Sequence, residues 1–180
     1  MLNQKRAPDA MIRPSFMPGF GFGKKAPGAG PKGLKLEHRI GVQAPPDVIW
    51  ELIADVRSWP DWNPLYSRAE GVLRIGAPLE LTLRLPDLPE RHIEPVVLEW
   101  VPNEQLHWRS SVAGGFGAAI RYIEIEQVAD SACIFSNGEL FQGWLGPTSA
   151  KRVQRPLKKG FAAMGEALKH RAETLWRGRG

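Results

Sequence analysis

Apolar and polar residues alternate from residue 36 onward, and this two-residue period predicts strands. In the first, residues 36–42, the side chains of Leu36, His38, Ile40 and Val42 share one face. The same period predicts six further strands, over residues 69–74, 79–85, 93–101, 105–112, 119–128 and 132–141. Short connections join almost all of them, which favours an antiparallel sheet because a parallel pair needs a long crossover.

A helical period replaces the alternation near the C-terminus. Six apolar residues recur three, four or seven positions apart and form one stripe: Val153, Leu157, Phe161, Met164, Leu168 and Leu175. Burying them contributes on the order of 10 kcal/mol before entropy, so this helix is expected to dock on the sheet. Thr148 or Ser149 is expected to cap it, and Pro156 to kink it or mark its first turn.

Two shorter helices are predicted directly after the first strand. Proline in the first turn of a helix sacrifices no hydrogen bond, so Pro45 and Pro46 fit the start of the first one. Pro60 and Pro64 interrupt the hydrogen-bond ladder of the next segment and limit it to a short helix or turn. Together these elements predict an α+β domain over residues 35–177.

Charge separates this domain from the residues that precede it. Residues 1–35 hold seven basic residues and one acidic residue, whereas residues 36–180 hold 17 basic and 18 acidic residues. The net charge of +5 therefore comes from a Gly/Pro-rich tail, residues 1–34, which is predicted to be disordered. The tail is interpreted either as a tether to anionic surfaces or as a dispensable extension. No nucleic-acid site is predicted on the folded domain, since it lacks a net basic charge.

Few other classes of protein fit the composition. A single cysteine, Cys133, excludes an intramolecular disulfide, and no apolar run reaches the length of a membrane-spanning helix. The histidines at 38, 92, 107 and 170 do not have the spacing of metal ligands, so no metal site and no cofactor are predicted. Without a secretory signal, the expected location is the cytoplasm, as a monomer or homodimer.

Five short motifs, in order along the chain, resemble a known superfamily. They are residues 44–50 (Ala-Pro-Pro-Asp-Val-Ile-Trp), 59–64 (Trp-Pro-Asp-Trp-Asn-Pro), 106–108 (Leu-His-Trp), 139–143 (Glu-Leu-Phe-Gln-Gly) and 160–169 (Gly-Phe-Ala-Ala-Met-Gly-Glu-Ala-Leu-Lys). They are similar to those of the polyketide cyclase/dehydrase-like branch of the SRPBCC (START/birch-allergen-like) superfamily. One departure is Gly165, where that family often has asparagine.

The resemblance implies a helix-grip fold. In this fold a seven-stranded curved antiparallel sheet is expected to wrap around the long C-terminal helix, with two short helices after the first strand. Members of the superfamily bind lipids, sterols, polyketides or quinones, and only some are enzymes. Function therefore has to be argued from the residues of the pocket.

The last hairpin supplies the candidate polar residues of that pocket. A turn centred on Asp130 pairs residues whose numbers sum to about 260, which places Arg121 opposite Glu139 and Ile123 opposite Asn137. These side chains are expected to face the helix-covered side. They form either a polar anchor for a ligand in an apolar cavity or a cross-strand ion pair that satisfies itself.

The predicted ligand-binding residues combine this polar set with apolar and aromatic neighbours. They are Trp62, Leu81, Leu83, Trp100, Trp108, Arg121, Ile123, Phe135, Asn137, Glu139, Phe141, Phe161 and Met164. Flat aromatic walls suit a hydrophobic ligand. Phe141 and Trp144 lie beside the loop before the last helix, where a gate to the pocket is expected.

Three functions are consistent with these residues. The first is a carrier or sensor of a hydrophobic small molecule without catalysis. The second is a polyketide cyclase or dehydratase in which Glu139 and Arg121 are the candidate catalytic pair, since such an enzyme needs an acid or base with a shifted pKa. The third is a module that binds a partner through its tail or sheet edge.

Overall fold

The computed structural model describes residues 33–179. Apart from its last two residues, the predicted tail of residues 1–34 lies outside this part. The strands are β1 (Leu34–Val42), β2 (Tyr66–Gly71), β3 (Leu79–Leu83), β4 (Arg91–Ile93), β5 (Val96–Val101), β6 (Gln105–Val112), β7 (Gly117–Ala129) and β8 (Ala132–Gly143). The helices are α1 (Pro46–Ala54), η1 (Val56–Ser58), α2 (Trp59–Trp62), η2 (Ala113–Gly115) and α3 (Gly146–Arg177).

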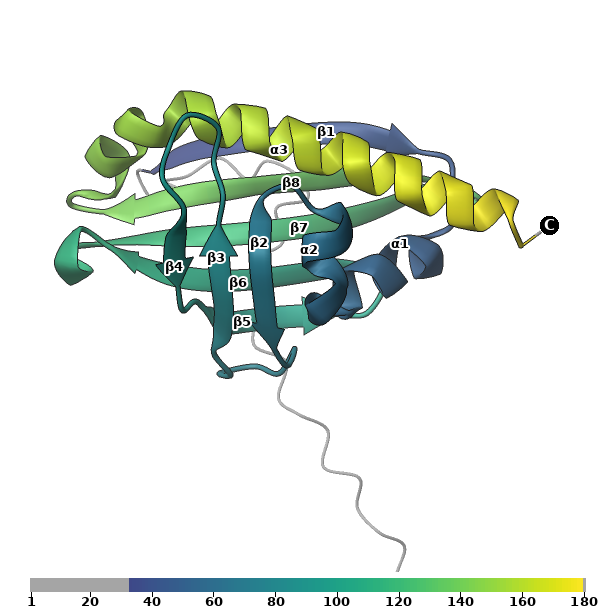
Figure 1. Cartoon of the computed structure of the whole chain (residues 1–180), viewed down its shortest axis with the longest axis horizontal. Coiled ribbons are helices and arrows are strands. Elements are labelled where there is room, and N and C mark those ends of the chain that lie inside the picture. Colours follow the sequence, from purple (N-terminus) through teal and green to yellow (C-terminus); the bar gives the residue numbers. More distant parts are fainter. Residues whose placement is uncertain (1–32, 180) are drawn as a thin grey trace, which may run out of the picture. The chain divides into compact units, whose positions relative to one another are not determined.

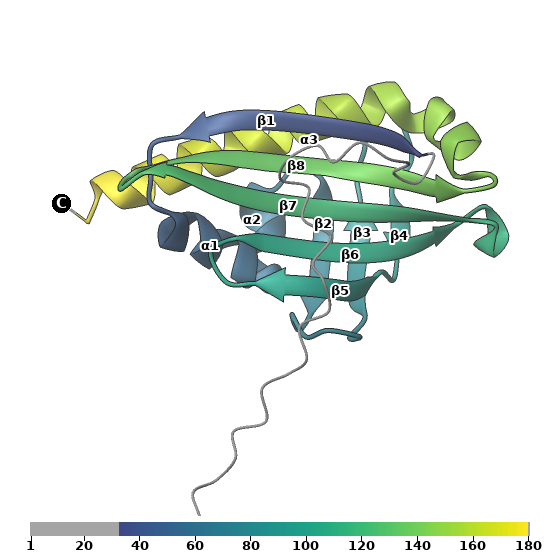
Figure 2. The same cartoon turned by 180° about the vertical axis from the view of Figure 1, so that it is seen from behind.

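The strands form two antiparallel sheets. Five strands pair in the order β1-β8-β7-β6-β5, and three pair in the order β2-β3-β4. Figures 1 and 2 show that the small sheet and α3 both lie on one side of the large, curved sheet. The α+β helix-grip arrangement predicted from the sequence is therefore confirmed.

The number of strands differs from the predicted seven, because residues 93–101 do not form one strand. Pro95 has no amide hydrogen to donate to a ladder, and the chain changes sheets there, between β4 and β5. The carbonyl of Pro95 instead accepts a hydrogen bond of 2.8 Å from the amide of Leu79. Next to it, the amide of Val97 donates to the carbonyl of Ala77 at 2.9 Å, which joins the two sheets at one end of β3.

Helix α3 packs along β1 and β8 (Figure 1). Its apolar stripe is buried from Leu157 to Leu168, whereas Val153 is partly buried and Leu175 is exposed. The helix begins at Gly146, earlier than predicted, and neither Thr148 nor Ser149 caps it, since the cap position is Leu145. Pro156 therefore lies inside the helix. Another segment approaches this helix closely at Gly160, where a Cβ atom would lie 2.4 Å from the Leu65 side chain.

The two short helices bring aromatic residues into the core. Trp59 on α2 is fully buried, and its indole N–H donates to the carbonyl of Ile53 at 3.0 Å. Its ring packs against Tyr66 on β2 and Trp108 on β6, with ring centroids 5.3 and 5.8 Å apart. Trp59 thus links the small sheet to the large one.

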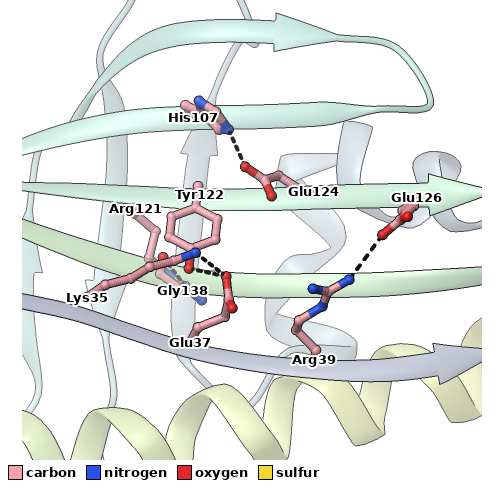
Figure 3. A network of polar contacts seen from close by, with 9 residues as sticks. All are labelled: Lys35, Glu37, Arg39, His107, Arg121, Tyr122, Glu124, Glu126 and Gly138. Carbon is pink, nitrogen blue, oxygen red and sulfur yellow. Dashed lines mark hydrogen bonds and ion pairs between the residues drawn. The ribbon is translucent and has the colours of Figure 1, made fainter. Parts of the chain in front are cut away.

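An aromatic clamp holds three strands together on the outer face of the large sheet. The hydroxyl of Tyr122 on β7 donates a 2.6 Å hydrogen bond to Glu37 on β1, across β8 (Figure 3). The ring passes over Gly138 so closely that a Cβ atom there would lie 2.2 Å from the Tyr122 oxygen. The clamp therefore requires glycine at position 138.

Candidate ligand cavity

A cavity of about 510 Å³ lies between the large sheet, the small sheet and α3. Its polar lining side chains are Tyr66, Glu90, Arg91, Ser110, Ser111, Arg121, Glu139 and Ser149. Its other lining residues are apolar: Leu83, Leu85, Leu88, Pro89, Ile93, Trp108, Val112, Ala113, Ala119, Phe141, Val153, Leu157 and Phe161. An apolar cavity with a few convergent polar groups is the usual form of a small-molecule site.

A second hollow of about 540 Å³ adjoins this cavity between β4 on one side and β5 and β6 on the other. The two share Arg91, Ile93, Ser110 and Ser111 in their linings. Within the described part of the chain, β4 pairs only with β3, so no hydrogen-bond ladder closes this gap.

Arg121 is the central polar residue of the cavity. It lies on β7 opposite Glu139, in the predicted register, and is only 5% exposed. Its guanidinium group lies 4.0 Å from the ring centroid of Phe161 and 5.8 Å from that of Trp108. Packing of a guanidinium between aromatic faces fixes its position and is itself favourable.

The hydrogen bonds of Arg121 within the described structure go to neutral acceptors. The guanidinium donates to the carbonyl of Gly138 at 2.8 Å (Figure 3), to the side-chain oxygen of Asn137 at 3.1 Å and to the sulfur of Met164 at 3.3 Å. Asn137 in turn donates to the carbonyl of Phe161 on α3 at 3.2 Å. No carboxylate of the described residues forms an ion pair with Arg121 within 4.0 Å. Its positive charge is therefore held in place without a direct counter-ion.

Glu139 presents a carboxyl group to the same cavity. Burial raises the pKa of Glu139 above its ordinary value, and the charges of Arg121 and Arg91 offset this only in part. The carboxyl therefore keeps its proton to a higher pH than an exposed glutamate does. Because it forms no ion pair in the described part of the chain, the predicted self-satisfied Arg121–Glu139 pair is not formed.

Tyr66 completes the polar group. Burial raises the pKa of the Tyr66 hydroxyl, while the neighbouring Arg121 lowers it and Glu139 raises it further. The hydroxyl thus remains protonated and can donate a hydrogen bond to a ligand oxygen. A cation, a carboxyl and a phenol therefore face one apolar space.

The structure brings together part of the residue set that the sequence predicted. Six of the thirteen line the cavity: Leu83, Trp108, Arg121, Glu139, Phe141 and Phe161. The other seven lie outside its lining: Trp62, Leu81, Trp100, Ile123, Phe135, Asn137 and Met164. Of these, Asn137 and Met164 contact Arg121 from behind.

The remaining five are packing residues. Leu81, Ile123 and Phe135 are fully buried in the core. Trp100 stacks on Trp50 with ring centroids 6.2 Å apart, and Trp62 is buried at the end of α2. All five therefore contribute to packing and not to the lining of the cavity.

Several lining residues were not singled out from the sequence. Tyr66 was missed because the second strand was placed at 69–74, whereas β2 begins at Tyr66. Arg91 was missed because β4 was not distinguished from β5. Val153 and Leu157 could have been predicted as lining residues, because both belong to the apolar stripe of the last helix. They lie four residues apart on the face that covers the cavity.

A comparison with protein-family models identifies the family. The model described as polyketide cyclase / dehydrase and lipid transport matches residues 34–173. The chain belongs to this family. A sequence search among curated proteins finds no significant match. Family membership agrees with the resemblance seen in the five motifs and with a hydrophobic ligand pocket.

Solved structures share the fold of this polyketide cyclase/dehydrase family chain. The Zhui aromatase/cyclase from Streptomyces sp. R1128 has a TM-score of 0.68 at 17% identity, covering 82% of this chain and 98% of that one. A START superfamily protein from Mycobacterium smegmatis has a TM-score of 0.63 at 15% identity, covering 78% and 98%. Norcoclaurine synthase from Thalictrum flavum, solved with dopamine and hydroxybenzaldehyde, has 0.59 at 17%, covering 77% and 85%.

Two searches of the described residues were negative. No helix within residues 33–179 is both long enough and apolar enough to cross a bilayer. Among the same residues, no three His, Cys, Asp or Glu side chains are grouped so that they could hold a metal ion.

Proposed function

We propose that the protein binds a hydrophobic small molecule, such as a lipid, polyketide or quinone, in this cavity as a cytoplasmic carrier or sensor without catalysis. The observation that carries the proposal is the buried cation of Arg121, which lines an apolar cavity and has no carboxylate of residues 33–179 within 4.0 Å. A buried charge without a direct partner is costly, and a ligand carbonyl, hydroxyl or carboxylate at this position would offset that cost.

The size of the cavity supports a small molecule rather than a peptide. A volume of about 510 Å³ lies within the range of roughly 300–1,000 Å³ that holds drug-sized ligands. The apolar walls would bury the ligand's rings or chain, and the polar group would orient one end of it. Asn137 and Met164 support the anchor from outside the cavity by holding the guanidinium.

Native mass spectrometry of protein purified from cells tests the proposal. We expect a co-purified apolar molecule on the wild type and its loss in Val153→Trp, which fills the cavity from α3. The control is Ile75→Trp, which adds the same side chain at an exposed position. Should the wild type carry no small molecule and also fail to bind the apolar anion 1-anilinonaphthalene-8-sulfonate, the proposed function is wrong.

The role of Arg121 as the polar anchor for a ligand is tested with the same fluorescent anion. Arg121→Gln removes the charge that would pair with its sulfonate, so we expect about tenfold weaker binding, the usual scale for a charge-assisted hydrogen bond. Binding of the neutral probe 1-aminoanthracene should change much less. Equal losses for both probes would indicate a damaged cavity instead of a lost anchor.

A second function, that of a cyclase or dehydratase, is favoured by the raised pKa of Glu139. A carboxyl that holds its proton toward neutral pH can act as a general acid, with Arg121 stabilising a developing oxyanion nearby. Structural neighbours named as an aromatase/cyclase and a synthase share this fold. Glu139→Gln should then abolish turnover of polyketide test substrates while leaving their binding intact, whereas unchanged turnover would remove Glu139 from the mechanism.

A further inference from the structure

Two exposed aromatic side chains lie on neighbouring loops at one end of the cavity. Trp144 is 83% exposed and Phe116 is 63% exposed. The two loops are hydrogen-bonded to each other, since the amide of Leu145 donates to the carbonyl of Phe116 at 3.4 Å. We call Phe116 and Trp144 the aromatic tip. Both are large apolar side chains that water covers over most of their surface.

The aromatic tip is placed by local backbone constraints. Gly114, Gly115 and Gly143 have φ values of +66°, +96° and +82°, which favour glycine. The loops also approach each other closely, because a Cβ atom on Gly117 would lie 2.9 Å from the amide nitrogen of Gly146. Figure 1 shows η2 and the start of α3 at the same end of the molecule.

A cationic face begins just after the aromatic tip. Five exposed basic residues occupy the first turns of α3: Lys151, Arg152, Arg155, Lys158 and Lys159. At 3.6 residues per turn they fall within an arc of about 120°, opposite the buried side chains of this helix. No acidic residue occurs between Glu139 and Glu166. Of the five, only Lys159 has an ion pair in the described structure, with Asp87 at 3.8 Å.

The cavity extends to this same end of the molecule. Val112 and Ala113, which precede Phe116 by four and three residues, line it from one side, and Ser149 lines it from the first turn of α3. An apolar ligand that entered here would pass between the two loops that form the aromatic tip.

We propose that the aromatic tip and the cationic face dock on the surface of an anionic phospholipid bilayer. Tryptophan and phenylalanine partition into the headgroup region of a bilayer, and lysine and arginine are attracted by anionic lipids, each adding roughly a factor of five in affinity. Neither group alone selects a membrane, but an aromatic pair beside a cationic face in which only Lys159 has an ion pair within the described residues matches an anionic interface. The docking is independent of the ligand proposed above, because it uses side chains outside the cavity lining.

Sedimentation of the full chain with ligand-free vesicles tests this docking. The vesicles contain phosphatidylcholine alone, or phosphatidylcholine with about one-third phosphatidylserine. We expect binding to the anionic vesicles and little to the neutral ones. Phe116→Ser with Trp144→Ser, and separately Lys151→Glu with Arg155→Glu, should each weaken binding at least about tenfold.

Matched controls alter the same side-chain types elsewhere. Trp176→Ser with Val72→Ser removes two exposed apolar residues, of which Trp176 lies at the far end of α3. Arg74→Glu with Arg171→Glu reverses two exposed charges that form no ion pair within residues 33–179. Both control pairs should retain wild-type binding, and circular dichroism should show that every variant is folded.

The basic residues 1–35 are present in all of these proteins, so differences between variants report the tip and the helix face. The proposal is overturned if the double variant of the aromatic tip, or that of the cationic face, binds anionic vesicles with wild-type affinity. That result would include the case in which the N-terminal charges alone bind the vesicles. Equal binding to neutral vesicles, or binding to RNA or acidic proteins with none to anionic vesicles, would also overturn it.

Discussion

At position 139 a carboxyl group faces an apolar cavity, and its protonation is linked to folding. The pKa of Glu139 in the folded protein is raised above its ordinary value of 4.5, first by burial. As the pH rises from the pKa of the unfolded chain to the higher pKa of the folded protein, Glu139 loses its proton first in the unfolded chain. The folded state therefore loses stability relative to the unfolded chain. At neutral pH Glu139 thus lowers the free energy of unfolding.

Glu139→Gln should remove this destabilising effect. We expect the free energy of unfolding to rise by about 1 kcal/mol at neutral pH, with the gain disappearing below about pH 4, where both states are protonated. Urea unfolding at several pH values measures it. The exposed Glu104→Gln is the control and should show no such pH dependence. A gain that persists unchanged in acid would contradict the assignment.

Gly165, at the position where the sequence departs from one of the five motifs, lies in a sterically restricted place. A Cβ atom at Gly165 would lie 2.8 Å from Nδ1 of His38, which packs against α3 from β1. This nitrogen is buried without a hydrogen-bond partner in the described structure. The ring of His38 therefore occupies the space that a larger side chain at 165 would need.

Gly165→Asn should destabilise the protein by about 1–3 kcal/mol through overpacking. Combining it with His38→Ala opens the space, so the double variant should lose less than the sum of the two single losses. Thermal denaturation of the four proteins gives this coupling. Strictly additive losses would show that His38 is not the obstacle.

Among single residues, the sequence predicted Arg121 and Glu139 better than their surroundings. Their register follows from side-chain alternation around one short turn, which is a local property. The roles of Trp62 and Trp100 could not be obtained in this way. Whether an inward-facing side chain meets a cavity or a neighbour depends on contacts between distant elements, such as the stacking of Trp50 on Trp100.

At the scale of elements, the clamp of Tyr122 holds β7, β8 and β1 together. Burial raises the pKa of Glu37, but hydrogen bonds from Lys35 and Tyr122 more than offset this, so the pKa lies below its ordinary value. Stability linked to this carboxylate is therefore present above the unfolded pKa of about 4.3 and is lost as the pH falls.

Tyr122→Phe should lower the free energy of unfolding by about 1.5–3 kcal/mol at neutral pH, since a hydrogen bond to a charged acceptor is lost. The loss should shrink below about pH 4, where Glu37 becomes protonated. Arg39→Met, which removes an exposed ion pair on the same strand, should cost less than about 1 kcal/mol. Similar losses for both variants would argue against the clamp.

Element boundaries show where local patterns are sufficient and where they fail. The strand at 105–112 was predicted with its observed bounds, because its alternation is unbroken. The division of residues 93–101 into β4 and β5 was missed, although Pro95 was visible. A single proline does not show that a chain changes sheets, since that depends on pairing with residues 76–79.

For the whole molecule, the residues that the structure describes already form a complete core. The first strand begins at Leu34, and the family match begins at the same residue. We therefore expect a chain that starts at Gly33 to unfold within about 0.5 kcal/mol of the full chain, as measured by urea denaturation. A large loss of stability would show that earlier residues contribute to folding, and loss of a captured partner would favour the partner-binding hypothesis.

The open side of β4 sets the limits of what the protein can accommodate. Among residues 33–179 no backbone ladder joins β4 to β6, and the four residues that line both hollows, at 91, 93, 110 and 111, lie where the two hollows meet. Side chains change rotamer on a timescale far shorter than sheet rearrangement. We therefore expect these four side chains to limit the size of a bound ligand. Substituting them should change which ligands fit without altering the backbone fold.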